Sequence, residues 1–362
     1  MLRENKIKVL VVEDSSVVRT LLEHILKSDP QIQVIGMVRN GHDALSFLTR
    51  ETPNVVLMDI EMPEMDGFET TRRIMETQPL PIVICSGSRN QSETITTFRL
   101  MEVGAVAFVE KPVGREHQDF DAVAGHLLQT VKLMSEVKVV RRWAKSTRTA
   151  VDSTPTSPAT PRRASGKIDV IGIGASTGGP PVIQTILTGL TKDFPVPLLV
   201  VQHIAPGFLP GLVDWLNQTT SLNVQVASYG VEPLPGNVYF APDDYHMAIS
   251  SGGRIVLSRE EPDSGLRPSV AHLFHSLAEF CGSRAVGVLL TGMGKDGAEE
   301  LKNLKNGGAL TIVQDRETSA VHGMPGEAIA LGAATYVLPP DGIARALVAA
   351  ANQELLLKRG MS

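Results

Sequence analysis

The sequence predicts an α/β protein with two doubly wound parallel sheets. Its 362 residues are enough for about two domains. Short runs rich in Val and Ile alternate with amphipathic helical segments. One stretch rich in Pro, Ser and Thr interrupts this alternation. We therefore predict domains over residues 1–138 and 168–362, joined by a flexible linker over residues 139–167.

The N-terminal alternation predicts five strands and five helices. The strand candidates are nearly continuous apolar runs, as in strands that are buried on both faces of a parallel sheet. These candidates lie at residues 8–14, 34–40, 54–59, 82–87 and 105–110. The helical segments between and after them lie at residues 15–28, 43–50, 67–76, 92–103 and 119–138.

The C-terminal part resumes the alternation and contains one irregular insert. Its clearest strand candidates lie at residues 169–174, 197–203, 285–292 and 309–314. Residues 224–256 look rich in hairpins, because Pro-Gly at Pro235 and Gly-Gly at Gly252 are turn signals.

Composition excludes several classes of protein. The 43% hydrophobic and 20% charged residues indicate a packed core rather than a disordered chain. A formal net charge of -5 argues against a dedicated nucleic-acid binder. Cys85 and Cys281 are too few for a disulfide framework or a cysteine zinc site. No apolar run approaches the roughly 18 residues of a membrane span, so we expect a cytoplasmic protein without membrane insertion.

Polar side chains follow the strands of the first predicted sheet. Glu13 and Asp14 follow one strand, Asp59 follows another, and Ser86 and Lys111 end two more. Ligands of parallel sheets bind at these carboxyl ends. Crowded carboxylates repel one another and need a cation, and oxygen ligands suit Mg²⁺. The pattern predicts a magnesium site of the kind that favours phosphate partners. The alternative is that these residues cap helices or solvate the strand ends.

The first strand of the second domain runs into a possible nucleophile. Residues 174–178 match G-x-S-x-G, the tight strand-to-helix turn that exposes a reactive serine, here Ser176. We expect the following helix to aim N–H groups at a developing oxyanion. A dinucleotide fingerprint departs at Thr177, which replaces its third glycine, and leaves only a variant phosphate-binding turn open. A P-loop fails at Asp296 after Gly-Lys. A purely structural glycine turn remains open.

A nucleophilic serine needs a base and an orienting acid. His203 ends the next strand and is the best-placed base. Asp296 and Asp315 each follow a later strand, and spacing alone leaves the choice between them open. The other histidines that we considered are expected in loops or helical stretches, as exposed or satisfied core residues: His246, His272, His275 and His322.

Residues 6–132 resemble the receiver domain of bacterial response regulators. The motifs that carry this resemblance are V-V-E-D-S, L-M-D-I-E-M-P-E-M-D-G-F and V-E-K-P. The resemblance implies a flavodoxin-like fold with Asp59 as the phosphoacceptor. It implies that Mg²⁺ is held by Glu13, Asp14 and Asp59, and that the switch residues are Ser86, Phe108 and Lys111. Glu13 stands where many relatives carry Asp.

The second domain resembles chemotaxis protein-glutamate methylesterases. G-I-G-A-S-T-G-G, Q-H-I-A-P-G-F and T-G-M-G-K-D-G-A carry this resemblance. It implies a doubly wound catalytic domain with Ser176 as nucleophile, His203 as base and Asp296 as orienting acid. It places the oxyanion donors at Met293 and Thr177.

The two resemblances together imply a phosphorylation-activated esterase. Its substrates would be glutamyl γ-methyl esters and glutamines of chemoreceptors, and a histidine kinase would be the phosphodonor. The unphosphorylated receiver would cover the catalytic cleft. We expect no cofactor in the catalytic domain, no nucleic-acid partner and a monomeric protein. The alternative is a non-enzymatic response regulator whose second domain binds a nucleotide or a protein.

Three positions depart from the family pattern. Lys295 stands beside the expected acid, where Asn is common, so a salt bridge there could shift the basicity of the histidine. Ala271 and Leu266 replace the common Asp and His around R-P-S-V. These two changes bear on substrate or domain contacts.

Overall fold

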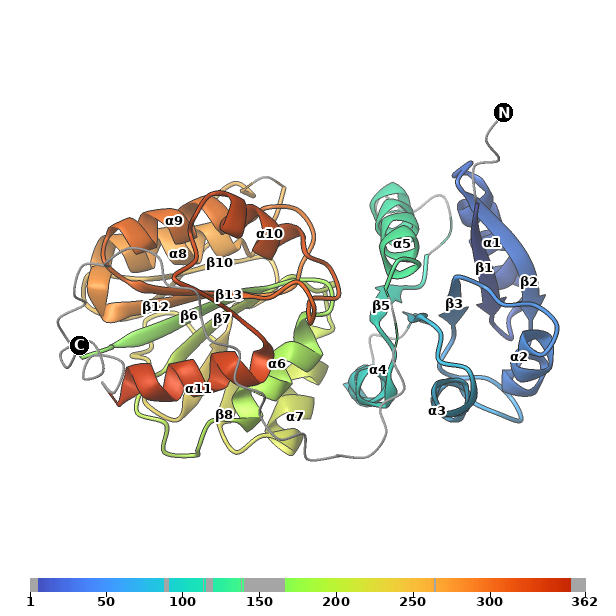
Figure 1. The fold of residues 1–362 in the computed structure, drawn as a ribbon, viewed down its shortest axis with the longest axis horizontal. Helices are drawn as coiled ribbons and strands as arrows, with labels where there is room; N and C mark the ends of the chain where they lie inside the picture. The colour runs from blue at the N-terminus through green and yellow to red at the C-terminus, as the bar shows by residue number, and fades with distance from the viewer. Residues whose placement is uncertain are drawn as a thin grey trace.

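A computed structural model describes most of the chain in two α/β domains (Figure 1). The described residues are 6–87, 91–112, 114, 120–137, 139, 167–263 and 265–352. The predicted linker therefore lies almost wholly outside the described residues, and its boundaries stay a prediction. No helix within these ranges is long and apolar enough to cross a membrane.

The first domain is a five-stranded parallel sheet with the strand order β2-β1-β3-β4-β5. Its strands are β1 (Ile7–Val12), β2 (Ile32–Val38), β3 (Val55–Met58), β4 (Ile82–Ser86) and β5 (Ala107–Glu110). The central strand β3 is buried along its whole length, as its apolar run predicts. This order is that of a flavodoxin-like fold and confirms the predicted fold class.

Five helices follow the five strands of this sheet. They are α1 (Ser16–Lys27), α2 (Gly41–Leu48), α3 (Gly67–Thr77), α4 (Gln91–Val103) and α5 (Phe120–Met134). Side-chain caps fix three of their starts: Ser15, Asn40 and Asp66 accept hydrogen bonds from amides of the first turns of α1, α2 and α3. The elements therefore begin and end close to the predicted positions.

The second domain is a seven-stranded sheet with the order β14-β13-β12-β6-β7-β9-β8, and every neighbouring pair is parallel. Its central strands are β6 (Val170–Ala175), β7 (Leu198–Gln202), β12 (Ala285–Leu289) and β13 (Leu310–Gln314), and its outer strands are β8 (Asn223–Val226), β9 (Asn237–Phe240) and β14 (Tyr336–Leu338). The doubly wound prediction is confirmed for this domain as well.

The region predicted to be rich in hairpins contains one hairpin in the described residues, between β10 (His246–Ile249) and β11 (Ile255–Ser258). The turn at Gly252 joins these two strands. In contrast, β8 and β9 pair in parallel with each other, and β9 pairs in parallel with β7. The Pro-Gly signal at Pro235 therefore belongs to a crossover between parallel strands and not to a hairpin.

Helices cover the two faces of the larger sheet (Figure 1). On one face lie α6 (Gly179–Thr188), α7 (Leu209–Thr219) and α11 (Pro340–Ala351). On the other face lie α8 (Val270–Phe280), α9 (Ala298–Asn306) and α10 (Gly323–Ala330). The two faces carry separate apolar clusters, so the sheet is buried on both sides.

The two domains meet where α4 lies against α7 (Figure 1). These helices approach closely because Gly211 has no side chain: a Cβ there would lie 2.2 Å from Oγ1 of Thr94. Four aromatic side chains fill the contact. They are Phe98 of α4, Phe108 of β5, Phe208 just before α7 and Trp215 of α7.

Candidate active site and phosphorylation site

Ser176 lies at the carboxyl end of β6, on a turn that glycines make possible. Its amide donates to the carbonyl of Thr291 at 3.0 Å, and the amide of Gly179 donates to its carbonyl at 2.8 Å. Gly178 has φ 77°, a left-handed conformation that favours glycine, and a Cβ there would lie 2.6 Å from Cβ of Ala320. The G-x-S-x-G prediction of a tight strand-to-helix turn therefore matches the backbone.

His203 follows the neighbouring strand β7 and reaches the same edge of the sheet. Ala175 and Gln202 are partners in the β6–β7 register, so Ser176 and His203 follow a matched pair. The amide of His203 donates to the carbonyl of Ala175 at 2.9 Å. No hydrogen bond joins the Ser176 side chain to the imidazole within the described ranges, and such contacts often tighten only when substrate binds.

Asp296 is the carboxylate that meets His203. Nε2 of His203 lies 2.9 Å from Oδ2 of Asp296, and the two side chains are only 13% and 6% exposed. Asp315, the competitor, instead accepts hydrogen bonds from the amide and hydroxyl of Thr318. Sheet order explains the difference: β12, which precedes Asp296, is next to β6, whereas β13 lies one strand further away.

Backbone amides of α8 hold Asp296 in place. The amides of Val270 and Ala271 donate to it at 2.7 and 2.9 Å, and the helix-capping Ser269 hydroxyl lies 3.4 Å from Oδ1. Burial raises the pKa of Asp296, but the close contact with His203 and the hydrogen bonds from these amides outweigh it and leave the pKa lowered. The carboxylate is therefore ionised at neutral pH.

Sequence reasoning missed this support from α8. The R-P-S-V segment carries a helix-capping signal, because Ser269 accepts from the amide of His272. That signal predicts where the helix begins, but nothing local predicts that its first turn meets Asp296. The change at Ala271 is compatible with this contact because the residue contributes its backbone amide.

The helix after Ser176 corrects one sequence expectation. Its first turn contains Pro180 and Pro181, which have no N–H, and the amide of Gly179 already donates to Ser176. The start of α6 therefore offers few amides to an oxyanion. Within the described residues, the amides of Thr177 and Met293 donate to no other protein group, so both can serve a ligand.

Among the described residues, none of the other four histidines considered from the sequence forms a hydrogen bond or ion pair with Ser176, His203 or Asp296, and one departs from expectation. His246 is the first residue of β10, not part of a loop or helix, and is 1% exposed. Its ring stacks on that of His272 in α8 at 4.6 Å between centroids. His275 pairs at 3.8 Å with Glu279 on the surface, and His322 precedes α10.

Lys295 does not form the salt bridge considered from the sequence. The residue is exposed, and among the described residues it makes no ion pair with Asp296. Lys295 therefore adds no ion pair to the His203–Asp296 contact.

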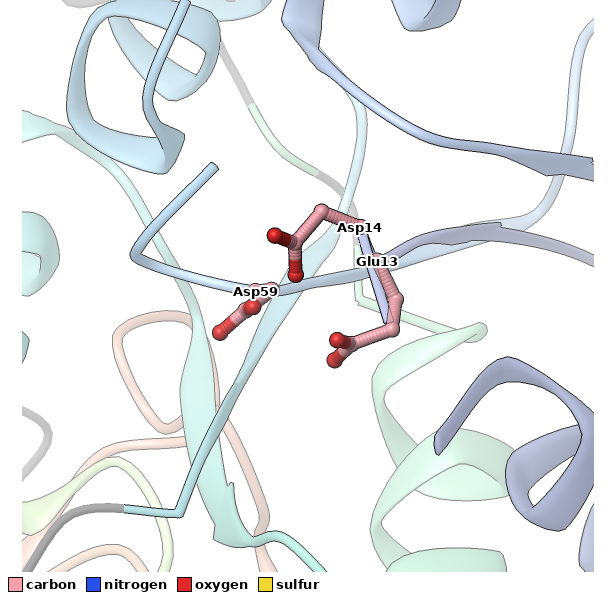
Figure 2. A group of neighbouring side chains, drawn as sticks. All are labelled: Glu13, Asp14 and Asp59. Carbon is pink, nitrogen blue, oxygen red and sulfur yellow. The ribbon is translucent and has the colours of Figure 1, made fainter. Parts of the chain in front are cut away.

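Three carboxylates gather where β1 and β3 end, as Figure 2 shows. One oxygen each of Glu13, Asp14 and Asp59 lies within 4.8 Å of the others. Nζ of Lys111, which follows β5, lies 2.9 Å from Glu13 and 2.7 Å from Asp59. The structure therefore brings together the side chains of four of the five residues that the strand ends predict for this site, all but Ser86.

Electrostatics at this site fit a bound cation. Burial, and then the charge of Asp59, raises the pKa of Glu13, while burial raises the pKa of Asp59. Burial also lowers the pKa of Lys111, but contacts with the two carboxylates outweigh this and leave it raised. Crowded oxygen ligands that are costly to ionise are what a magnesium ion relieves. The donor set therefore fits Mg²⁺.

Comparison with known proteins agrees with both sites. A family model described as CheB methylesterase matches residues 171–347, and one described as response regulator receiver domain matches residues 9–119. A protein-glutamate methylesterase/protein-glutamine glutaminase of Syntrophus aciditrophicus is 52% identical over 346 residues, covering 94% of this chain and 97% of that protein. One of Geobacter metallireducens is 49% identical over 350 residues, covering 96% and 100%. This chain belongs to the protein-glutamate methylesterase/protein-glutamine glutaminase family.

A solved structure resembles the second domain of this methylesterase-family chain. It is the catalytic domain of Thermotoga maritima CheB methylesterase, which is 39% identical, with a TM-score of 0.49. The match covers 51% of this chain and 98% of the Thermotoga maritima domain.

Of the three residues expected to act as the receiver switch, Phe108 reaches the contact between the domains. Ser86 is buried at the end of β4, and its carbonyl accepts from the amide of Lys111 at 2.8 Å. Phe108 lies two strand positions before Glu110, the register partner of Ser86. Its ring centroid is 5.1 Å from that of Phe208 in the catalytic domain. A short path therefore connects the acidic site with the domain contact.

The receiver also contacts the loops around Ser176. Val321 belongs to the apolar cluster of the receiver core, and Met293 packs against the same cluster. A cleft of about 1270 Å³ runs between the domains and is lined by Leu133 of α5 and by Gly178 and His322 of the catalytic domain. The receiver therefore borders the turn that carries the candidate nucleophile.

Proposed function

We propose that Ser176, His203 and Asp296 form the catalytic triad of this protein-glutamate methylesterase and glutaminase. The contact of His203 with a buried, amide-held carboxylate at 2.9 Å, one strand from the Ser176 turn, carries this proposal. The reaction is hydrolysis of glutamyl γ-methyl esters on chemoreceptors, and the same site deamidates glutamine.

The contacts assign one role to each nitrogen of the imidazole. Nε2 of His203 faces Asp296, so Nδ1 is the nitrogen left to take the proton of Ser176. As Oγ attacks the ester carbonyl, the imidazole becomes an imidazolium that the ionised Asp296 stabilises. The amides of Thr177 and Met293 donate to the oxyanion of the tetrahedral intermediate.

Two proton transfers complete the cycle. His203 returns its proton to the methoxide, and methanol leaves an acyl-enzyme on Ser176. Water then attacks the acyl-enzyme, with His203 as base, and releases the glutamate carboxylate and the serine. A glutamine substrate follows the same path and loses ammonia instead of methanol.

The receiver domain makes this activity dependent on phosphorylation by a histidine kinase. We assign Asp59 as the phosphoacceptor, with Glu13, Asp14 and Asp59 as the carboxylates that would hold Mg²⁺. The ion would offset the negative charge that otherwise keeps a phosphoryl group from a carboxylate. Lys111, which already contacts Asp59, would neutralise phosphoryl oxygens.

Activation would then proceed through the domain contact. A phosphoryl group on Asp59 competes for Lys111 and Ser86, and Phe108 transmits the change to Phe208. Opening the contact uncovers the Ser176 turn. A shift from 1:99 to 99:1 between closed and open states requires about 5.5 kcal/mol of differential stabilisation.

Methanol release from methylated receptor membranes tests the proposed triad. We expect the wild-type chain to release methanol faster with a small-molecule phosphodonor, and Ser176→Ala to release none above background while keeping its melting temperature. Ser258→Ala, a serine of β11 in the separate two-stranded sheet, is the matched control and keeps full activity. A serine-directed probe should label the wild type and Ser258→Ala but not Ser176→Ala. Native methanol release by Ser176→Ala would reject the triad, and a wild-type chain without any release would favour a non-enzymatic regulator.

A further inference from the structure

Gln202 is a buried polar residue whose side chain contacts the backbone of the proposed active site. It is the last residue of β7 and is 4% exposed. Its side-chain Nε2 donates to the carbonyl of Ser176 at 2.9 Å and to the carbonyl of His203 at 2.8 Å. A single amide group therefore joins the backbones of the proposed nucleophile and base.

The surroundings allow only one orientation of this amide. Both of its partners are carbonyl oxygens, which accept hydrogen bonds, so the NH₂ end must face them. The opposite end, Oε1, is buried and has no hydrogen-bond partner within the described residues. It faces Gly179, where a Cβ would lie 2.2 Å from Oε1. Reversing the amide would bring three oxygens together.

The start of α6 cannot satisfy this buried oxygen. The amide of Gly179 already donates to Ser176, and the next two residues, Pro180 and Pro181, carry no N–H. A buried acceptor without a donor costs free energy, and such groups are uncommon in folded proteins. The unsatisfied Oε1 belongs to the same amide group that bonds the carbonyl of Ser176.

From these contacts we propose that Gln202 is a positioning residue for ester hydrolysis. Its two hydrogen bonds fix the distance between the Ser176 turn and the His203 backbone, and hence the approach of Oγ to the imidazole. The inference rests on the proposed triad. Misplacement of reacting groups by about 1 Å can cost 100-fold in rate, so two bonds at this point have a direct effect on turnover.

The main test replaces Gln202 by Met and measures turnover by the full-length chain. Gln202→Met keeps a similar length but donates no hydrogen bond, so kcat for methanol release should fall by about 10- to 100-fold. KM should stay near the wild-type value, since Gln202 is buried and its hydrogen bonds go to the backbone carbonyls of Ser176 and His203. Gln202→Glu should be at least as slow at neutral pH, because an ionised carboxylate offers only acceptors to the two carbonyls.

Thr311→Val provides the matched control for a structural effect. Thr311 is fully buried in β13 and donates to the carbonyl of Ala333, away from the Ser176 turn. We expect this variant to lose a similar amount of thermal stability but to keep wild-type kcat. An equal fall in kcat in Thr311→Val and Gln202→Met would overturn the inference, as would wild-type kcat in either Gln202 variant.

Two further comparisons separate this inference from the proposed function and from regulation. If Ser176→Ala still releases methanol, the triad itself is wrong. If Ser176→Ala is inactive while Gln202→Met turns over normally, only the positioning role is wrong. The ratio of rates with and without phosphodonor should be unchanged in Gln202→Met, and a changed ratio would assign Gln202 to the domain contact instead.

Discussion

The acidic site and the Ser176 site both lie at the carboxyl ends of strands in parallel sheets. Different interactions position their side chains. In the receiver, opposite charges face each other, with Lys111 between Glu13 and Asp59. In the catalytic domain, backbone groups hold the one buried carboxylate, Asp296, and one imidazole contacts it. The first site therefore combines acceptors with one ammonium group, whereas the second holds its carboxylate mainly with backbone amides.

The pKa shifts at the two sites run in opposite directions for this reason. Burial raises the pKa of Glu13 and Asp59, so their ionised forms are disfavoured until a cation arrives. Hydrogen bonds to Asp296 outweigh burial and lower its pKa. The receiver carboxylates are therefore costly to ionise in the absence of a metal, whereas the contacts of Asp296 favour its ionised form.

The largest expected effect comes from Asp296→Asn. Loss of the ionised partner leaves the imidazolium of His203 unsupported, and kcat for methanol release should fall by up to about 10⁴-fold. Asp315→Asn is the matched control, since Asp315 contacts Thr318 instead, and it should stay near wild-type activity. Steady-state kinetics of both variants, with folding checked by circular dichroism, decide the matter; equal losses would place the acid elsewhere.

The next effect concerns the receiver. Asp59→Ala should remove activation by a phosphodonor while leaving the basal release of methanol, because Asp59 lies in the other domain. Chelation of Mg²⁺ should likewise abolish activation of the wild type, and returning the ion should restore it. Loss of basal activity in Asp59→Ala would show that the residue does more than accept a phosphoryl group.

A smaller change is expected from loosening the domain contact at Glu102. Its Oε1 accepts from Nε1 of Trp215 at 3.0 Å and from Nε2 of Gln184 at 2.8 Å. Glu102→Ala removes both bonds, worth about 1–3 kcal/mol for charged acceptors, so basal activity should rise up to about tenfold. Glu23→Ala, which removes a surface ion pair of α1, is the control and should leave the basal rate alone. An unchanged rate in Glu102→Ala would mean that the α4–α7 contact does not restrain the enzyme.

The smallest effect is a pair of opposite responses to acid. Asp59 has a raised pKa in the folded state, so its charge opposes folding above that pKa, and Asp59→Asn should raise the melting temperature at pH 7 without Mg²⁺. The gain should vanish as pH falls below the unfolded pKa. Asp296 has a lowered pKa, so it stabilises the fold above the unfolded pKa and loses this contribution as pH falls through the folded one. Melting curves between pH 3 and 7 for wild type, Asp59→Asn and Asp296→Asn should therefore diverge in opposite directions at neutral pH.

Much of the fold could be predicted because short sequence patterns indicate its strands and helices. The Val- and Ile-rich runs of β3 and β7 specify strands buried on both faces, and capping residues such as Asp66 mark helix starts. The family expected from the motifs is confirmed by the relatives. The parallel pairing of β8 was not predicted, because a Pro-Gly turn signal does not tell how far the chain travels before it pairs.

The parts of the sites that were not predicted depend on contacts between distant segments. Spacing left Asp296 and Asp315 equivalent, and only the order of strands across the sheet separates them. Phe108 packs against Phe208 between the two domains, and the sequence pattern of neither domain indicates this contact. Such contacts follow from the shapes of assembled surfaces rather than from the periodicity of any one segment.

The paired prolines at the start of α6 also limit which ligands this edge of the sheet can accept. In nucleotide-binding α/β proteins, successive amides at the same strand-to-helix junction surround a phosphate. Here Pro180 and Pro181 carry no N–H, so a phosphate at that junction would meet fewer backbone donors than it does in those proteins. Two prolines thus make the β6–α6 junction a poor phosphate site, although many nucleotide-binding proteins share the fold.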